Sequence, residues 1–139
     1  MTVLRTALFA AVAFATCVSI SAQAIDVVEV KTDDGLTAYL SEDHTNPIIA
    51  VSFQFRGGAT MDSDDKLGLS YMVSGLLDEG AGDLDSFAFQ SQLEDMAIQL
   101  SFDAGMESFS GSLTTVTANA DGAFRLLASA LSEPRFDDE

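Results

Sequence analysis

Apolar and polar residues alternate most clearly between Ile49 and Phe55. Ile49, Val51, Phe53 and Phe55 are apolar, and the residues between them are small or polar. Because successive side chains of a strand point to opposite faces of a sheet, this period of two predicts a strand with one buried face. The pair Gly57-Gly58 follows directly and predicts where the strand ends.

Three other segments repeat their apolar residues at the spacing of an α-helix. The first helix is expected over Leu67–Leu77, after acidic residues that can cap it and before a glycine-containing exit at residues 80–82. The second is expected over Ser86–Met96, and the third over Ala120–Leu131, ahead of the helix-stopping Pro134. The apolar positions that define the three predicted faces are, in order: Leu69, Met72, Val73, Leu76 and Leu77; Phe87, Phe89, Leu93 and Met96; Phe124, Leu127, Ala128 and Leu131.

Four further short segments favour strands. Val27–Lys31 and Leu36–Ser41 flank the turn sequence at residues 32–35, so they predict a hairpin. Ile98–Ala104 and Ser108–Thr115 follow one another later in the chain. The resulting order is strand, strand, strand, helix, helix, strand, strand, helix. It predicts an α+β fold in which helices pack on a mostly antiparallel sheet.

The first 24 residues have the pattern of a secretory signal peptide. Arg5 precedes an apolar run over Ala7–Ile20, and small residues lead up to Ala24, after which we expect cleavage. The run is shorter than the ~20 residues of a membrane span. A lipoprotein reading through Cys17 is the alternative, although the residues before Cys17 are a poor lipid-attachment sequence. We therefore expect a periplasmic or secreted protein with one domain over residues 25–139, which looks incomplete at its C-terminus.

Charge narrows the range of partners. The chain has 22 acidic and 6 basic residues and a net charge of −16, and all of the acidic residues follow residue 24. Such a surface repels phosphate backbones and anionic lipid, so we expect no nucleic-acid and no membrane-surface partner. We also expect no membrane span after signal cleavage. The acidic residues are scattered, and we interpret them as a solubilising surface. The only cysteine lies in the signal peptide, which leaves no disulfide.

A longer pattern spans residues 47–82. The extended segment Val51–Gly58 ends in a glycine pair, Asp62 follows, and the next helix opens with Gly68-Leu69-Ser70. In these features the chain resembles the pitrilysin/insulinase-type zinc peptidase family, which includes the mitochondrial processing peptidase. The resemblance covers most of the chain after residue 24 and implies the fold of that family's metalloenzyme half-domain.

The helix departs from the family at the residues that perform the chemistry. In active members it continues His-x-x-Glu-His, where two histidines hold zinc and the glutamate is the general base. The resemblance places Tyr71 and Gly75 at the ligand positions and Ser74 at the base position. Glycine cannot coordinate, tyrosine is a poor substitute for imidazole, and neutral serine cannot take a proton from water. We therefore assign no catalytic or metal residue and expect no cofactor in this chain. The family's third ligand, a glutamate, is implied beyond Glu139.

The sequence does not support another metal site or a nucleophilic catalytic site. His44 is the only histidine, and we interpret it as an exposed loop residue. The acidic cluster from Asp62 to Asp65 lacks the glycine of a calcium loop, since Leu67 stands at the sixth position, and we interpret it as a helix cap. Ser74 has no nearby histidine that could activate it as a nucleophile.

The resemblance implies a function without catalysis. In two-component members of the family, a subunit without zinc completes the substrate chamber of a zinc-bearing partner. We expect this chain to be such a subunit, with zinc in the partner and peptides as substrates. Active relatives bind substrate by adding it to a sheet edge. The matching residues here are Gln99, Leu100, Ser101, Phe102 and Asp103. Leu100 and Phe102 are equally interpretable as residues that face the core.

Two alternatives stay open. The chain can be part of an active zinc metallopeptidase whose ligands lie outside these 139 residues. It can also be a structural protein of the cell envelope, because some family members have structural roles within larger complexes.

Overall fold

The computed structural model describes residues 25–137. The predicted signal peptide over residues 1–24 lies outside the described residues. The chain divides into two compact units, with the boundary between Asp43 and His44. Each unit is described by itself.

The first unit contains a β-hairpin. Strand β1 (Val28–Lys31) pairs antiparallel with β2 (Thr37–Leu40). The turn is closed by hydrogen bonds from the backbone amide of Gly35 to the carbonyl of Thr32 (3.0 Å) and from the amide of Thr32 to the carbonyl of Leu36 (2.9 Å). Gly35 has φ of 87°, a left-handed conformation that glycine adopts without strain. The hairpin predicted from the turn sequence is present.

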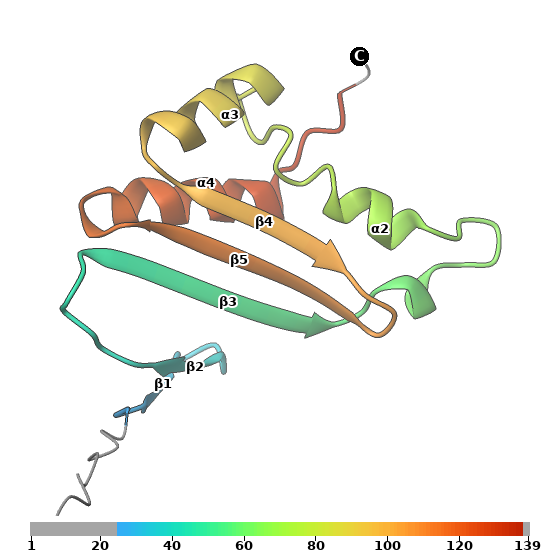
Figure 1. Ribbon diagram of the computed structural model, residues 1–139. Coiled ribbons are helices and arrows are strands. Elements are labelled where there is room, and N and C mark those ends of the chain that lie inside the picture. The colour runs from blue at the N-terminus through green and yellow to red at the C-terminus, as the bar shows by residue number, and fades with distance from the viewer. Residues whose placement is uncertain (1–24, 138–139) are drawn as a thin grey trace, which may run out of the picture. The chain divides into compact units, whose positions relative to one another are not determined.

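The second unit is built on a three-stranded sheet (Figure 1). Strand β3 (Ile48–Arg56) and strand β4 (Gln99–Ala104) both pair antiparallel with the middle strand β5 (Ser108–Val116). The strand order is therefore β3-β5-β4, and within the described residues β3 and β4 are the edges. The alternation in β3 matches the prediction for Ile49, Val51 and Phe53, which are its partly buried residues. Phe55, predicted on the same face, is 50% exposed.

The register brings the apolar residues of the three strands onto one face. The cross-strand rows on that face are Val51–Leu113–Leu100 and Phe53–Gly111–Phe102. The opposite face carries mostly small polar side chains, because the neighbouring positions in each strand point away from the core. The sheet thus has one apolar and one polar face, as expected for an antiparallel sheet that is covered on one side.

Helices cover the apolar face. Helix α3 (Ser86–Asp95) and helix α4 (Ala120–Ser132) contribute to its core, whereas the short α2 (Leu69–Ser74) packs against β4 (Figure 1). Two 3₁₀ turns, Ala59–Met61 and Thr117–Asn119, follow β3 and precede α4. The α+β fold predicted from the sequence, with helices on an antiparallel sheet, is confirmed.

The core joins the helices to the sheet. Phe89 of α3 and Leu113 of β5 are its largest fully buried side chains. Around them lie the other buried members of the cluster, which come from both layers: Ala81, Leu93, Ile98, Leu100, Ala123, Leu126, Leu127 and Ala130. Burial of this apolar surface drives the packing of helices on the sheet.

The buried face of α4 differs from the predicted one. Of the four predicted residues only Leu127 is buried, while Phe124 and Leu131 are 44% and 40% exposed and Ala128 is exposed. The residues that face the core are Gly122, Ala123, Leu126, Leu127 and Ala130. Three of these are glycine or alanine, so the helix approaches the sheet on its small side chains. Apolar residues occupy two sides of this helix, and spacing alone does not choose between them.

Helix α2 is shorter than predicted. It ends at Ser74 rather than at residue 77, and the chain continues in turns in which the amide of Leu76 donates to the carbonyl of Val73 (3.0 Å). These turns still carry Leu77 into the core, but Leu69 and Met72 are exposed. Phe87 of α3 is also exposed, against the predicted apolar face of that helix.

Among residues 25–137, the helices are too short or too polar to cross a membrane.

Candidate functional site

The start of α2 is organised by Asp62. Its carboxylate accepts hydrogen bonds from the backbone amides of Gly68 (2.8 Å) and Ser70 (3.0 Å) and from the Ser70 hydroxyl (2.5 Å). These bonds, with the Ser70 hydroxyl as the largest contribution, lower the pKa of Asp62 from its ordinary value. Gly68 has φ of 90°, which turns the chain into the helix. The predicted helix-capping role of the acidic cluster therefore belongs to Asp62.

The residues at the family's zinc-motif positions have other environments. Tyr71 is 72% exposed. Ser74 is buried, and its hydroxyl donates to the backbone carbonyl of Tyr71 (2.8 Å), within the same helix. Gly75 is the C-terminal cap of α2, with φ of −82° and ψ of −5°. The Ser74 hydroxyl is thus committed to its own helix, and neither Tyr71 nor Gly75 offers an imidazole.

Residues 25–137 contain no group of three or more His, Cys, Asp or Glu side chains arranged to hold a metal ion. His44 is exposed and precedes β3, as predicted for a loop residue.

A cleft lies where α2 packs against the edge strand β4. It has a volume of about 310 Å³. Its walls are formed by residues of both elements: Tyr71, Met72, Ser74, Gly75, Leu76, Phe102 and Asp103. The structure therefore brings together two groups of residues that the sequence singled out separately. We call this feature the α2–β4 cleft.

The predicted substrate-binding residues form most of β4. Gln99, Ser101 and Asp103 are exposed, whereas Leu100 is buried in the core and Phe102 is half-buried. Since β4 pairs with β5 alone in the described part of the chain, its other side is available to an added strand. That Leu100 faces the core agrees with the alternative interpretation of this residue. Peptide binding along β4 stays a prediction.

Phe102, which lines the cleft, packs beside a glycine of the middle strand. The rings of Phe53 and Phe102 meet edge to face across Gly111, with centroids 6.4 Å apart. A Cβ atom at Gly111 would overlap the ring of Phe53 and lie 3.0 Å from Phe102. Glycine at this position therefore leaves room for the Phe53 and Phe102 rings of the two outer strands to contact each other over the middle strand.

A shallow hollow of about 420 Å³ lies on the sheet and includes residues of its polar face. The hydroxyls of Ser101 and Ser112 are 2.9 Å apart there, in hydrogen-bonding distance across the strands. The sequence reasoning did not identify this surface. Its signal is the serine at every second position of β5, at 108, 110 and 112.

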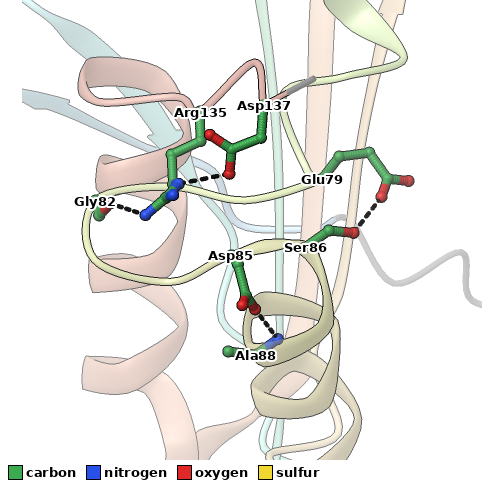
Figure 2. Close-up of polar contacts among 7 residues, drawn as sticks. All are labelled: Glu79, Gly82, Asp85, Ser86, Ala88, Arg135 and Asp137. Carbon is green, nitrogen blue, oxygen red and sulfur yellow. Dashed lines mark hydrogen bonds and ion pairs between the residues drawn. The ribbon is translucent and has the colours of Figure 1, made fainter. Parts of the chain in front are cut away.

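The segment that links α2 to α3 is held by contacts with Glu133 and Arg135 (Figure 2). The Arg135 guanidinium forms an ion pair with Asp137 (2.8 Å), and its second branch approaches the carbonyl of Gly82 (3.5 Å). The amide of Gly82 donates to the carbonyl of Glu133, and the amide of Arg135 donates to that of Gly80 (both 2.9 Å). The backbone groups of Gly80 and Gly82 thus form hydrogen bonds that hold this linker in place.

Two acidic side chains of this linker accept hydrogen bonds. The carboxylate of Glu79 accepts from the Ser86 hydroxyl (2.8 Å), and that of Asp85 accepts from the amide of Ala88 (2.9 Å) and caps α3 (Figure 2). Burial raises the pKa of Asp78 from its ordinary value, with a smaller contribution from the nearby charge of Glu79. Asp78 is half-buried, whereas the neighbouring Glu79 is exposed.

The comparison with known sequences finds a related protein. The chain is 30% identical over 95 residues to the non-peptidase homolog YmxG of Helicobacter pylori (strain ATCC 700392 / 26695). The match covers 68% of this chain and 22% of that protein. No protein-family model matches the chain.

Solved structures share the fold. The crystal structure of a peptidase M16 inactive domain from Pseudomonas fluorescens matches with a TM-score of 0.74 at 21% identity, over 81% of this chain and 28% of that one. A protease from Helicobacter pylori matches with a TM-score of 0.68 at 16% identity, over 83% of this chain and 28% of that one. The chain spans less than a third of each of these three proteins. These similarities in sequence and fold confirm the resemblance to the pitrilysin/insulinase-type (M16) peptidase family, in a chain that carries no His-x-x-Glu-His motif.

Proposed function

We propose that this chain is part of a non-catalytic subunit of an exported, two-component zinc peptidase. In this assembly it holds peptides beside a partner of the same family, and the partner carries the zinc and cleaves them. The observation that carries the proposal is the combination at the α2–β4 cleft: the peptidase fold and a free edge strand are retained, while all three motif positions have lost their chemistry.

The loss of chemistry is supported residue by residue. In the family's zinc chemistry, the metal lowers the pKa of its bound water so that a hydroxide nucleophile forms at neutral pH. Gly75 has no side chain, and the Ser74 hydroxyl is bonded to the carbonyl of Tyr71. Restoring a metal site would therefore require several simultaneous changes on α2. The names of the sequence relative, a non-peptidase homolog, and of the structural neighbour, an inactive domain, support the same reading.

The retained edge supports a role in holding peptides. A sheet edge presents unpaired backbone amides and carbonyls, which an extended peptide can pair with irrespective of much of its sequence. The strand β4 is such an edge in the described part of the chain, and the α2–β4 cleft lies beside it. Export to the periplasm or the cell exterior is part of the proposal and is supported by the pattern of the first 24 residues.

The proposal is tested with the purified full-length protein that contains this chain, alone and with copurifying partners. We expect no cleavage of unstructured peptides by the protein alone and no stoichiometric zinc by elemental analysis. We expect affinity purification from envelope extracts to recover a partner with an intact His-x-x-Glu-His motif, and expect the two together to cleave peptides faster than the partner alone. Stoichiometric zinc in the isolated protein would favour an active metallopeptidase. A partner that is equally active alone would contradict the subunit role.

A further inference from the structure

The turn of the β1–β2 hairpin contains a reactive pair of residues. Asp34 and Gly35 are adjacent and exposed in this turn. In an Asp-Gly pair, the amide nitrogen of the glycine can attack the side-chain carboxyl of the aspartate, because glycine has no Cβ atom to block the approach. The sequence has one other such pair, Asp121-Gly122. The two pairs lie in different elements, so the fold decides how fast each one reacts.

Local contacts leave the first pair open to this reaction. A Cβ atom built at Gly35 meets nothing within 4 Å, and the Asp34 carboxylate has no hydrogen-bond or ion-pair partner within the described residues. The amide of Gly35 donates to the carbonyl of Thr32 (3.0 Å). Both strands of the hairpin are exposed along their whole length, and a two-stranded hairpin has little stability by itself. The hydrogen bond that occupies the Gly35 nitrogen therefore opens readily.

The second pair is held by its helix. Asp121 and Gly122 lie in the first turn of α4, and closing a ring between them requires backbone angles that differ from those of a helix. Gly122 is buried, and a Cβ atom there would overlap Met96. The Asn119 side-chain amide donates to the carbonyl of Met96 (2.7 Å), which fixes the start of α4 to the end of α3. This pair reacts only after the start of α4 has opened.

We propose that Asp34 is a site of spontaneous conversion to isoaspartate, which opens the β1–β2 hairpin. In the first step the Gly35 nitrogen forms a bond to Cγ of the protonated Asp34 carboxyl. The amide proton and the carboxyl hydroxyl leave together as water, and the product is a five-membered cyclic imide. In the second step water adds to one of the two imide carbonyls. Addition at the main-chain carbonyl breaks the original peptide bond and leaves the chain running through Cβ and Cγ, whereas addition at Cγ restores aspartate. Water is the only other reactant.

The rearrangement lengthens the turn. Isoaspartate adds one carbon atom to the main chain between Asp34 and Gly35. The turn is closed by the hydrogen bonds from Gly35 to Thr32 (3.0 Å) and from Thr32 to Leu36 (2.9 Å), and the added atom displaces their donors from their acceptors. The strand pairing begins directly after the turn, so the hairpin loses its closed end. This inference does not depend on the subunit role proposed above.

The test stores the purified full-length protein that contains this chain at neutral pH for several weeks. A carboxyl methyltransferase specific for isoaspartate labels the product, and peptide mapping by mass spectrometry locates the label. We expect residue 34 to be converted at least about tenfold faster than residue 121, because the helical pair reacts only from a locally opened state. In urea that unfolds the protein, the two pairs are expected to react at similar rates.

Two variants and one structural readout locate the effect. Asp34→Ser removes the reacting carboxyl and is expected to abolish labelling in the turn. The matched control is Asp33→Ser, which removes the same charge from the preceding residue and is expected to keep the wild-type rate. Hydrogen exchange is expected to show that the amides of Thr32 and Gly35 lose protection in stored wild-type protein, while the amides of β5 keep theirs. In stored Asp34→Ser, the protection of the turn is expected to persist.

The outcomes separate the parts of this proposal. Equal conversion of residues 34 and 121 in the folded protein, or equal loss of labelling in Asp33→Ser and Asp34→Ser, overturns the assignment of the site. Unchanged protection of the turn in molecules that carry isoaspartate at residue 34 overturns the opening of the hairpin. None of these results alters the expected zinc content, partner or peptide cleavage, so this inference and the subunit role fail independently.

Discussion

Single side chains set the local structure at the start of α2 and in the core of the sheet. The Ser74 hydroxyl donates a hydrogen bond to a carbonyl of its own helix. The Asp62 carboxylate accepts hydrogen bonds from the amides of Gly68 and Ser70 and from the Ser70 hydroxyl, where that helix begins. Thr115 of β5 is 2% exposed. Its hydroxyl oxygen has no hydrogen-bond partner in the described structure. The contribution of Asp62 and of Thr115 to the stability of the folded protein can be measured directly.

Replacing Thr115 with valine is expected to stabilise the protein by about 1 kcal/mol. A buried polar group without a partner loses its hydrogen bonds to water on folding, and valine has nearly the same shape without that cost. The change is measured as a higher urea midpoint. Thr114→Val, on the less buried neighbouring position of the same strand, serves as the control and is expected to shift the midpoint less. A lower midpoint for Thr115→Val would mean that its hydroxyl is satisfied.

Asp62→Asn is expected to lower stability in a pH-dependent way. Hydrogen bonds hold the folded-state pKa of Asp62 below 3.8, its ordinary value. The carboxylate therefore stabilises the folded state at pH values above 3.8, and this contribution is lost as the pH falls through the lowered pKa. Urea midpoints of wild type and variant should differ at pH 7 and converge in acid.

Asp64→Asn is the control for Asp62, because Asp64 lies in the same loop and its carboxylate makes no hydrogen bond or ion pair within the described residues. Its midpoint should follow the wild type at each pH. A difference for Asp62→Asn that stays constant down to the lowest pH would show that its charge is not what stabilises the start of α2.

At the scale of elements, the sheet depends on close contacts across its middle strand. Gly111 lies between two phenylalanines in the register, and α3 and α4 pack on the face that they share. The same face forms the inner wall of the α2–β4 cleft through Phe102. The row Phe53–Gly111–Phe102 therefore takes part in strand pairing, in core packing and in the wall of the cleft.

Gly111→Ala is expected to destabilise the protein by about 1–3 kcal/mol, the usual cost of inserting a methyl group into a filled space. Alanine is favoured over glycine in a strand, but the overlap with the Phe53 ring outweighs that gain. Gly57→Ala is the control, since a Cβ there would lie 3.9 Å from Phe109. Denaturation curves should show loss of stability for Gly111→Ala alone, and equal stability of both variants would contradict the close packing.

At the largest scale, the second unit is held together by contacts between residues 133–135 and residues 80–82. Backbone hydrogen bonds join Glu133 and Arg135 to the linker between α2 and α3 (Figure 2). The linker follows α2 directly, so the hydrogen bonds of Glu133 and Arg135 hold the segment that leads from the cleft to α3. Loops held by few contacts open locally and are cut by proteases from that open state.

Deleting residues 133–139 is expected to increase cleavage after Glu79 by glutamyl endopeptidase roughly tenfold, the change that corresponds to two lost backbone hydrogen bonds of modest net strength. Mass spectrometry measures this cut against cleavage after Glu107, which lies in the turn between β4 and β5 and serves as the internal control. Unchanged cleavage after Glu79 would show that the chain end does not restrain the linker.

Much of this fold was predictable because its signals are local. The alternation in β3, the turn before Leu36 and the helix signals near Ser86 and Ala120 act over a few residues, and the structure has strands and helices at those places. The residues at the motif positions are likewise a property of the chain alone: no folding can give Gly75 a side chain.

Only the tertiary structure decided which faces meet. Helix α4 has apolar residues on two sides, and its contact with the sheet selects the side with Ala123 and Ala130, because small side chains permit closer packing than Phe124 would. Likewise, residues 71–76 and 102–103 come together in one cleft through the β4–β5 pairing and the packing of α2. Sequence periodicity reports the environment along one element, whereas a cleft is defined by the distance between two elements, and that distance is set by packing.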